Sequence, residues 1–359
     1  WTESGKDMGL SACGKSEKLP EDYYKFLQAE FEKPRHIYKG MSAFNEQPKE
    51  HFERSANLAR SIQDYFEETI MACVHDITKT YPEYRNINLM GGCGLNCLTV
   101  SKIVKEKLFD HVFIPPCPND EGISLGSAYY KAIEKGFEQF SPHKIEDINP
   151  YLGSEKSIHG IDNEDKIREL FSNHKIEKVN NPSLVAAKLI HQGEIIAWFQ
   201  GRSECGPRAL GNRSILSLPG IPGRKKELND HIKFRESFRP YGCSVLLQDA
   251  HKYFDCPENY HMPYMSFAPK VRSQFADLLT EVTHVDQTCR IQTINRKQNQ
   301  RYYDLISEVK RLQGHGLLLN TSLNIMGKPI LETIQDAADF MKDTKIKSMI
   351  LGDFLISKK

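Results

Sequence analysis

The sequence predicts an α/β protein built from two units. Patterns typical of strands and of helices alternate along the chain, and a polar stretch without a sustained hydrophobic period, 136–163, separates two such groups. The 359 residues are enough for two domains, and 39% hydrophobic with 26% charged residues is ordinary for a globular protein. We expect a first domain over 1–150, a linker over 151–163 and a second domain over 164–359.

The first domain is expected to contain a long packing helix. From Glu50 to about Lys79, apolar residues recur at intervals of three and four, as on one face of a helix. The elements expected next are a strand at 87–90, a glycine turn at 91–94, a helix at 96–107 and a strand at 112–114. After a proline-rich turn comes a helix containing Gly126, Ser127 and Ala128, whose small side chains would allow close packing.

The second domain has clear helix and strand signals at both ends. Asn181 is a favoured N-cap and Pro182 a favoured first helical residue, so we expect a helix to Ile190, followed by a strand at 194–199. Near the C-terminus we expect a strand at 316–319, a helix that starts with a capping box at 333–336 and ends near Lys342, and strands at 349–351 and 354–357.

Composition limits the function classes. The 48 Lys and Arg residues balance the 47 Asp and Glu residues, so the overall charge gives no reason to propose a nucleic-acid or membrane partner. No apolar run approaches the ~20 residues that cross a bilayer, and the N-terminus lacks a secretion signal. Nine scattered cysteines favour reduced thiols. We expect a cytoplasmic enzyme, and the start at Trp1, without an initiator Met, suggests a fragment.

The strongest chemical signal is the segment 201–215. Its glycines let backbone amides approach an anion, and Arg202, Arg208 and Arg213 offer forked donors to phosphate or carboxylate oxygens. Further basic residues follow within thirty positions: Lys225, Lys226, Lys233, Arg235 and Arg239. The alternative is a solvated basic face. Because the glycines and Pro207 indicate a shaped loop, we expect an anion-binding site.

Two features of the first domain have both a functional and a structural interpretation. Gly91 and Gly92 at a strand end, with Asn96 opening a helix, permit close approach of a ligand, yet paired glycines are also ordinary turn residues. Asp120 could bind a divalent cation or simply favour a helix start. None of the 13 histidines is four residues from another, so no HxxxH pair exists to complete a metal site.

Two polar clusters in the second domain complete the candidates. The segment 283–290 combines His284 with a carboxylate and Arg290, and His284 is either a general acid or base or an orienting hydrogen-bond partner. Asn320, Ser322 and Asn324 follow a predicted strand, where ligand sites of α/β proteins usually lie.

Six segments together resemble successive signatures of the NodU/CmcH carbamoyltransferases. They are GKDMGL (5–10), GGCGLNC (91–97), GPRALGNRSI (206–215), FRP (238–240), THVD (283–286) and LNTSLN (319–324). The resemblance covers nearly the whole chain. It implies part of an actin and sugar-kinase-like domain, followed by a YrdC-like α/β domain. It also implies an ATP-dependent O-carbamoyltransferase, in which the YrdC-like domain makes carbamoyl adenylate from carbamoyl phosphate and ATP with Mg²⁺. The carbamoyl group then passes to a hydroxyl group of a small-molecule or sugar acceptor.

The resemblance also assigns residues. A KxR element and a TSxN element contact the nucleotide and acyl phosphate in YrdC-like sites, and Lys233 to Arg235 and Thr321 to Asn324 are similar to them. The residues so implied as catalytic are Lys233, Arg235, His284 and Arg290. Those implied as substrate or nucleotide ligands are Gly91, Gly92, Asn96, Arg202, Arg208, Arg213, Ser214, Arg239, Asn320, Ser322 and Asn324.

The resemblance leaves the transfer step open. Asp120 matches the family's metal-binding aspartate, which would hold Fe²⁺ or another divalent ion with two histidines that this sequence lacks. The first half of that domain, roughly 150 residues by ordinary domain sizes, is absent as well. The chain is thus a fragment, or another chain or a second copy completes it. The alternatives are an enzyme of the tRNA threonylcarbamoyladenosine pathway and a truncated nucleotide-binding subunit that needs a partner.

Overall fold

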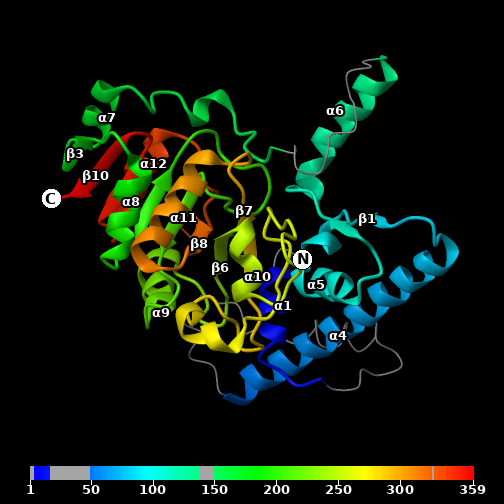
Figure 1. The fold of residues 1–359 in the computed structure, drawn as a ribbon. Helices are drawn as coiled ribbons and strands as arrows, with labels where there is room; N and C mark the ends of the chain where they lie inside the picture. Colours follow the sequence, from blue (N-terminus) through cyan, green and yellow to red (C-terminus); the bar gives the residue numbers. More distant parts are fainter. Residues whose placement is uncertain (1–3, 17–48, 137–148, 326) are drawn as a thin grey trace.

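The larger unit of the structure is built on one mixed β-sheet (Figure 1). The computed structural model describes residues 4–16, 49–136, 149–325 and 327–359. Within them, eight strands lie in the order β3-β10-β9-β4-β5-β8-β6-β7. The strands are β3 (His174–Lys178), β4 (Ile196–Phe199), β5 (Arg213–Ser217), β6 (Gly242–Leu246), β7 (Arg290–Ile294), β8 (Leu317–Ser322), β9 (Ser348–Leu351) and β10 (Phe354–Lys358). The predicted α/β class is confirmed.

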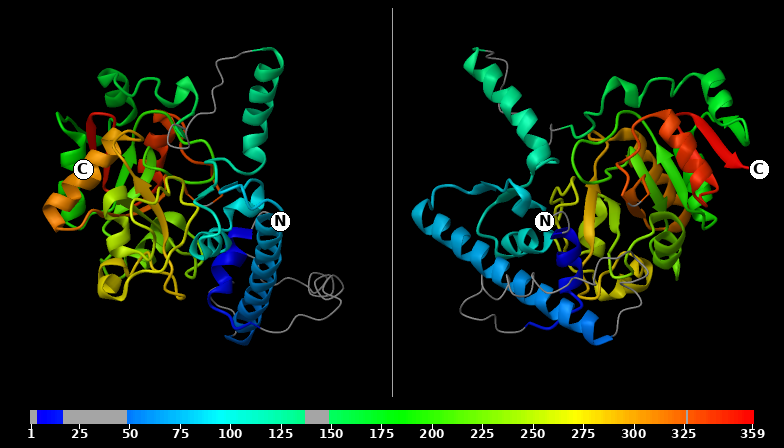
Figure 2. Two further views of the ribbon diagram at one scale, coloured as in Figure 1. Left: turned by 45° about the vertical axis from the view of Figure 1, so that its right-hand side comes forward. Right: turned by 180° about the vertical axis from the view of Figure 1, so that it is seen from behind.

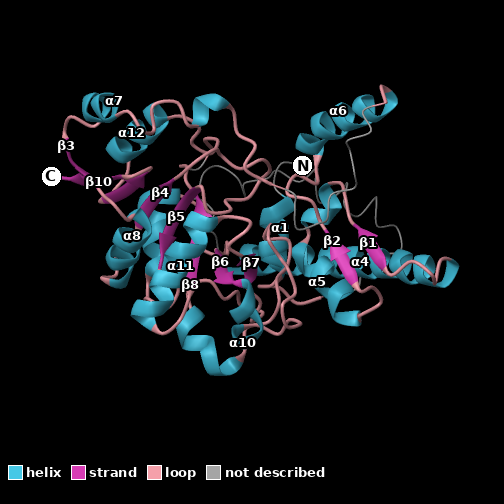
Figure 3. Ribbon diagram, turned by 45° about the horizontal axis from the view of Figure 1, so that its top comes forward, coloured by secondary structure: helices cyan, strands magenta, loops and turns pink. Residues whose placement is uncertain are grey.

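Helices cover both faces of this sheet (Figure 3). Ile196 and Trp198 of β4 pack with α8 (Pro182–His191) and α11 (Gln300–Gln313), while the intervening Ala197 and Phe199 pack with α7 (Glu164–Leu170) and α12 (Ile334–Asp343). Successive strand residues point to opposite faces, so a strand buried on both faces is apolar throughout. The shorter elements are α9 (Arg224–Leu228), a π-helical turn (Asn229–Lys233), α10 (Ala250–Tyr253) and the 3₁₀ segments Glu155–Ser157, Leu247–Asp249 and Ser273–Leu279.

The predicted helix caps are present. The Asn181 side chain accepts a hydrogen bond from the Leu184 amide at 2.9 Å, with Pro182 as the first residue of α8. At α12 the Thr333 hydroxyl accepts from the Asp336 amide at 3.2 Å, and the Asp336 carboxylate accepts from the Thr333 amide at 2.7 Å. Capping by such side chains satisfies amides that a helix leaves without partners.

The first unit is smaller and less compact. Its helices are α1 (Ser4–Ser11), α4 (Lys49–Thr80), α5 (Cys97–Glu106) and α6 (Ile123–Glu134), with 3₁₀ turns at Gly92–Leu95 and Asp120–Gly122. A pair of parallel strands, β1 (Asn86–Asn88) and β2 (His111–Phe113), completes it. The predicted helices at 50–79 and 96–107 are confirmed. The first strand begins one residue earlier and ends two residues earlier than predicted, at Asn86–Asn88, and the predicted glycine turn follows with φ of +79° at Gly91.

Helix α6 contradicts the expectation of close packing. None of its side chains is buried, and the helix extends away from the rest of the unit (Figures 1 and 2). Ile123, Tyr130 and Ile133 are 63%, 73% and 63% exposed. Within the described ranges, no helix combines the length and the apolar character needed to cross a bilayer.

The first unit contacts the second through α5, β2 and the loop after β2. The Ser101 hydroxyl accepts from the Ala268 amide at 2.7 Å, and the Tyr260 hydroxyl accepts from the Val112 amide at 3.2 Å. The predicted linker 151–163 contributes as well, because the Gly153 amide donates to the Ser203 carbonyl at 3.0 Å. This contact brings the linker against the arginine-rich segment.

The sheet gathers the candidate residues at one edge. Gly242 at the start of β6 pairs with Arg290 at the start of the parallel β7 and with Asn320 near the end of the antiparallel β8. Ser214 at the start of β5 pairs with Ser322. The starts of β5, β6 and β7 and the end of β8 therefore lie together along one side of the sheet, at the strand ends.

Candidate functional site

The arginine-rich segment connects β4 to β5, and its backbone is held from inside the protein. Glu204 is 7% exposed, and its Oε1 accepts the amides of Leu210 and Asn212 at 2.8 Å each and that of Arg213 at 3.1 Å. The sequence indicated that amides of this segment could approach an anion. At these three positions the expectation is wrong, because the Glu204 carboxylate occupies the amides. A ligand anion would depend on side chains instead.

Arg213 is fully buried within the sheet unit. Its guanidinium donates to the carbonyls of Gln200, Leu331 and Glu332 at 2.6, 3.1 and 3.4 Å and lies 3.5 Å from the centroid of the Phe199 ring. Burial lowers its pKa to about 10. The guanidinium donors hold the backbone together, so this arginine has a structural position rather than the ligand position that the sequence indicated.

Arg202 and Ser214 also differ from simple ligand residues. Arg202 is exposed, and its Nε donates to the Gly153 carbonyl at 2.5 Å. The Ser214 hydroxyl is buried on β5 without a hydrogen-bond partner in the described part of the chain. The structure thus separates the predicted ligands of this segment, and Arg208 remains the one with an uncommitted guanidinium group near the other cations.

Three arginines, two from connections and one from a strand, come together where β5, β6 and β7 begin. Arg208 lies on the β4–β5 connection, Arg239 precedes β6, and Arg290 begins β7. Burial and the neighbouring charges of Arg208 and Arg239 together lower the pKa of Arg290 to about 9. The Nε atoms of Arg208 and Arg290 are buried without a hydrogen-bond partner among the described residues. Half-buried cations that converge, two of them with free buried Nε donors, form an arrangement that can bind a polyanion.

Lys233 joins the two elements that resembled a nucleotide site. It is 5% exposed at the end of the π-helical turn, and its Nζ donates to the carbonyl and hydroxyl of Ser322 at 2.8 and 3.1 Å. The same atom donates to the carbonyl and the Oδ1 of Asn324 at 3.0 and 2.5 Å. Burial lowers its pKa well below the ordinary lysine value, with further lowering by Arg235 and Arg239. A π-helical turn is rare and often marks a functional site.

Arg235 is fixed beside Lys233. Its Nε donates to the Asn229 Oδ1 at 3.1 Å, one terminal nitrogen donates to the Pro240 carbonyl at 3.2 Å, and the guanidinium lies 4.0 Å from the centroid of the Tyr241 ring. The Tyr241 hydroxyl donates to the same Asn229 oxygen at 2.6 Å. Burial lowers the pKa of Arg235 to about 10. Asn229 and Tyr241 were not expected from the sequence, and no motif marked them.

His284 lies against the segment that carries Arg239. Its Nε2 is 3.2 Å from the Phe238 carbonyl, and its Nδ1 is 3.8 Å from the Asp286 Oδ1. Burial opposes ionisation of Asp286, but the nearby His284 and hydrogen bonds from the side chain and amide of Thr288 outweigh it and lower its pKa to about 2. The imidazole is thus held between a carbonyl and a carboxylate.

Asn320 lies beneath the arginine-rich segment rather than at the surface. It is 1% exposed, and its Nδ2 donates to the Ala209 carbonyl at 3.2 Å, the Ser244 hydroxyl at 3.0 Å and the Gln292 Oε1 at 3.2 Å. Ser322 donates to Asn324 at 2.6 Å. Asn320 therefore supports the loop, whereas Ser322 and Asn324 surround Lys233.

The candidates of the first unit are not gathered into a comparable site. Asn96 caps α5 through a 3.2 Å bond from the Thr99 amide and exchanges side-chain hydrogen bonds with Gln63. Gly91 has open space around it, and Gly92 lies beside Asn119. The Cys97 thiol, which no prediction singled out as a ligand, lies in the field of Arg290 and Arg208. Because Cys97 is the first residue of α5, the start of this helix lies near the arginines.

Asp120 does not fit a metal site within the described residues. It is exposed on a 3₁₀ turn, and no group of three or more His, Cys, Asp or Glu side chains among those residues could hold an ion. All nine cysteines are free thiols, as predicted.

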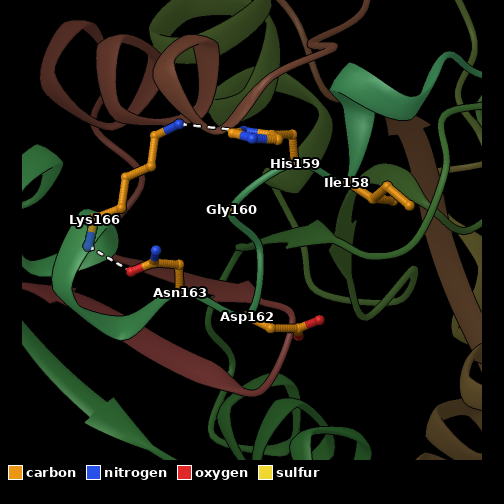
Figure 4. A pocket seen from close by; sticks show the side chains of 6 residues that line it. All are labelled: Ile158, His159, Gly160, Asp162, Asn163 and Lys166. Atoms are coloured by element: carbon orange, nitrogen blue, oxygen red, sulfur yellow. Dashed lines mark hydrogen bonds between the residues drawn. The ribbon is translucent and has the colours of Figure 1, made fainter.

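A surface hollow of about 440 Å³ lies apart from all predicted ligands (Figure 4). His159 and Lys166 point toward each other across it, with Nδ1 and Nζ 3.4 Å apart. None of the residues that line it belongs to the candidate site.

Comparison with known families identifies the chain. The family description "Carbamoyltransferase N-terminus" matches residues 3–129, and "Carbamoyltransferase C-terminus" matches residues 187–358. The chain belongs to the carbamoyltransferase family. The arginine cluster and the Lys233 contacts fall within the second of these carbamoyltransferase regions.

Relatives of the chain include nodulation proteins and cephem O-carbamoyltransferases. The chain is 34% identical to nodulation protein NolNO of Sinorhizobium fredii over 307 residues, which are 84% of this chain and 44% of that protein. It is 33% identical over 272 residues to a 3'-hydroxymethylcephem-O-carbamoyltransferase of Streptomyces clavuligerus, covering 76% of this chain and 49% of that enzyme. The chain thus spans about half the length of these curated relatives.

Proposed function

We propose that this chain is the activating part of an ATP-dependent O-carbamoyltransferase and that its sheet unit forms carbamoyl adenylate. The observation that carries the proposal is the convergence of Arg208, Arg239 and Arg290, two of them with buried donors that have no partner among the described residues. Carbamoyl phosphate and ATP are both polyanions, and fixed cations stabilise charge that develops during phosphoryl and adenylyl transfer. Membership of the family supports carbamoyl phosphate as the donor.

The proposed reaction balances in atoms. Carbamoyl phosphate, ATP and water give carbamoyl adenylate, pyrophosphate and phosphate. The bond from the α-phosphorus of ATP to pyrophosphate breaks, a carbamate oxygen bonds to that phosphorus, and the donor's phosphoryl group leaves as phosphate. In a second step the acceptor hydroxyl attacks the carbamoyl carbon, AMP leaves, and the hydroxyl proton is lost to a base or to solvent. The acceptor is proposed as a small molecule or sugar because relatives include a cephem O-carbamoyltransferase.

Each residue has a proposed part. Arg208, Arg239 and Arg290 bind phosphate oxygens, with Arg235 contributing positive charge from beside Tyr241. Lys233 fixes the Ser322 to Asn324 turn at the nucleotide site. His284, committed to Phe238 and Asp286, orients the segment that carries Arg239 rather than transferring a proton itself.

The finer fold identities are part of the proposal. The eight-stranded mixed sheet and its helices support a YrdC-like unit, and the α/β arrangement of the first unit supports part of an actin and sugar-kinase-like domain. We propose no metal site at Asp120, because this residue is exposed and has no companion ligands among the described residues.

The experiment is a donor panel with the purified chain and ATP. Carbamoyl phosphate should produce pyrophosphate, whereas threonine with bicarbonate, the donors expected of the tRNA threonylcarbamoyladenosine pathway, should not. Pyrophosphate produced with threonine and bicarbonate alone would replace the proposed function with that alternative.

We further propose that transfer to an acceptor needs a partner that completes the first unit. Parallel sheets normally have both faces covered and more than two strands, yet β1 and β2 form a pair by themselves among the described residues. Large apolar side chains stay exposed nearby, including Tyr84, Met90, Tyr130 and Ile133. The chain also spans about half of its relatives.

Co-expression tests this partner. The segment of a relative that lies outside the matched region should bind the chain and restore acceptor carbamoylation, and Tyr130→Ser with Ile133→Ser should weaken that binding. Self-association of the chain, abolished by the same pair of substitutions, would instead identify a second copy as the partner. A monomer that carbamoylates an acceptor alone contradicts the proposal.

A further inference from the structure

Glu204 is a buried carboxylate whose contacts fix the loop that presents Arg208. Its Oε1 accepts three backbone amides, those of Leu210, Asn212 and Arg213, at 2.8, 2.8 and 3.1 Å. Hydrogen bonds to an ionised acceptor are roughly twice as strong as neutral ones. Arg208 lies between the carboxylate and these amides in the sequence. The loop is therefore closed on itself around Arg208.

The carbonyls of the same loop are held by other buried side chains. The Leu210 carbonyl accepts from the Tyr151 hydroxyl and from the Gln292 Nε2, both at 2.8 Å. The Gly211 carbonyl accepts from the Trp198 indole at 2.8 Å. These contacts come from the linker segment and from two strands, so they set where the loop lies over the sheet. They hold carbonyl oxygens and so do not replace the contacts of Glu204 with the amides of Leu210, Asn212 and Arg213.

We infer that Glu204 is a positioning residue for anion binding and acts through Arg208. The inference rests on the proposed function, because it assumes that Arg208 contacts the phosphate groups. An arginine that is preorganised loses less conformational entropy on binding than one on a free loop. The long β4–β5 connection needs such an internal anchor, since an unanchored loop of this length would sample many conformations. Glu204 thereby fixes the β4–β5 connection and, with it, the position of the Arg208 guanidinium.

The test is a double-mutant cycle with Glu204→Gln and Arg208→Ala. Glutamine keeps an oxygen for the amides but removes the charge, so the variant should fold. We expect Glu204→Gln to lower kcat/KM for carbamoyl phosphate about tenfold and to weaken inorganic phosphate binding, measured by calorimetry, by a similar factor. In the Arg208→Ala background the same substitution should change phosphate affinity less than about twofold, because its effect passes through Arg208.

Glu332→Gln is the matched control. The Glu332 carboxylate accepts from the Ser203 hydroxyl at 2.5 Å and the Ser154 amide at 3.1 Å, next to the loop but without contact to its three amides. Its phosphate affinity should stay within about twofold of the original protein. An equal loss from Glu204→Gln in both backgrounds overturns the inference and leaves Glu204 merely structural. If Arg208→Ala itself leaves phosphate affinity unchanged, the proposed anion site fails instead, and with it the inference.

Discussion

The Nζ of Lys233 donates to the main-chain carbonyl of Ser322 over 2.8 Å, joining residues 89 positions apart in the sequence. This contact, together with those to Asn324, closes the π-helical turn onto the end of β8. Two short motifs that are separate in sequence thus form one buried unit, and its integrity should decide activity.

Lys233→Ala and Lys233→Arg should both lower carbamoyl-phosphate-dependent pyrophosphate release by about 100-fold or more. Alanine leaves the acceptors of Ser322 and Asn324 without a donor, and the larger planar guanidinium does not fit a site that is 5% exposed and shaped around an ammonium. Ser322→Ala, which removes one acceptor of several, should lose less than about tenfold. Full activity of Lys233→Arg would show that only the charge matters.

Arg208→Ala and Arg213→Ala should fail for different reasons. Arg213→Ala leaves buried carbonyls unpaired and should destabilise the fold by at least about 3 kcal/mol, measured by denaturant unfolding. Arg208→Ala should leave the free energy of unfolding within about 1 kcal/mol and still abolish pyrophosphate release. If the Arg213→Ala protein were as stable as the original but inactive, Arg213 would bind the substrate rather than support the fold.

Phosphate should stabilise the protein, and Arg290→Met should remove most of this effect. Burial and the charge of Arg239 lower the pKa of Arg208, and burial and the charges of Arg208 and Arg239 lower that of Arg290, so a bound anion would relieve this repulsion. Saturation at 100 times the Kd corresponds to about 2.7 kcal/mol of added stability. Without phosphate, Arg290→Met should have a Tm equal to or above that of the original protein, because a buried cation is lost. If Arg290→Met had a lower Tm and were still stabilised by phosphate as much as the original protein, Arg290 would not be part of the anion site.

Asp286→Asn should alter stability only above a defined pH. The pKa of Asp286 is about 2 in the fold against an ordinary 3.8, so the ionised form stabilises the fold above about pH 4. This contribution, ~2 kcal/mol, is lost as the pH falls through 2. The difference in unfolding free energy between the two proteins should therefore shrink between pH 5 and about pH 3. A difference that does not change over this interval contradicts the role assigned to His284 and Thr288.

Periodicity and caps predicted the helices well because they are local signals. The α4 face, the Asn181 cap and the Thr333 capping box need only neighbouring residues to be recognised. Strand β5 was not predicted, because its residues stood within a segment interpreted as a glycine loop. Its buried Arg213 obtains partners from residues up to 119 positions away, which no local pattern reveals.

The candidate site was predicted in part. Motifs indicated Arg208, Lys233, Arg290 and Asn324, since basic and amide side chains are the chemistry of phosphate binding. They could not distinguish Arg208 from Arg213, because only the fold shows that Arg213 is fully buried among backbone carbonyls while Arg208, five positions earlier, is half-buried. The glycines indicated that amides of the segment could approach an anion, whereas the folded loop uses those of Leu210, Asn212 and Arg213 for Glu204. Whether these amides bind a ligand or a side chain of the protein depends on the tertiary fold, which local sequence patterns do not show.

Pyrophosphate release by the purified chain, with and without Arg208→Ala, tests the central claim most directly. The account predicts release when ATP and carbamoyl phosphate are both present, none when either is omitted, and none in the folded Arg208→Ala variant with both. Equal release in the two proteins, or release that does not depend on carbamoyl phosphate, would contradict it.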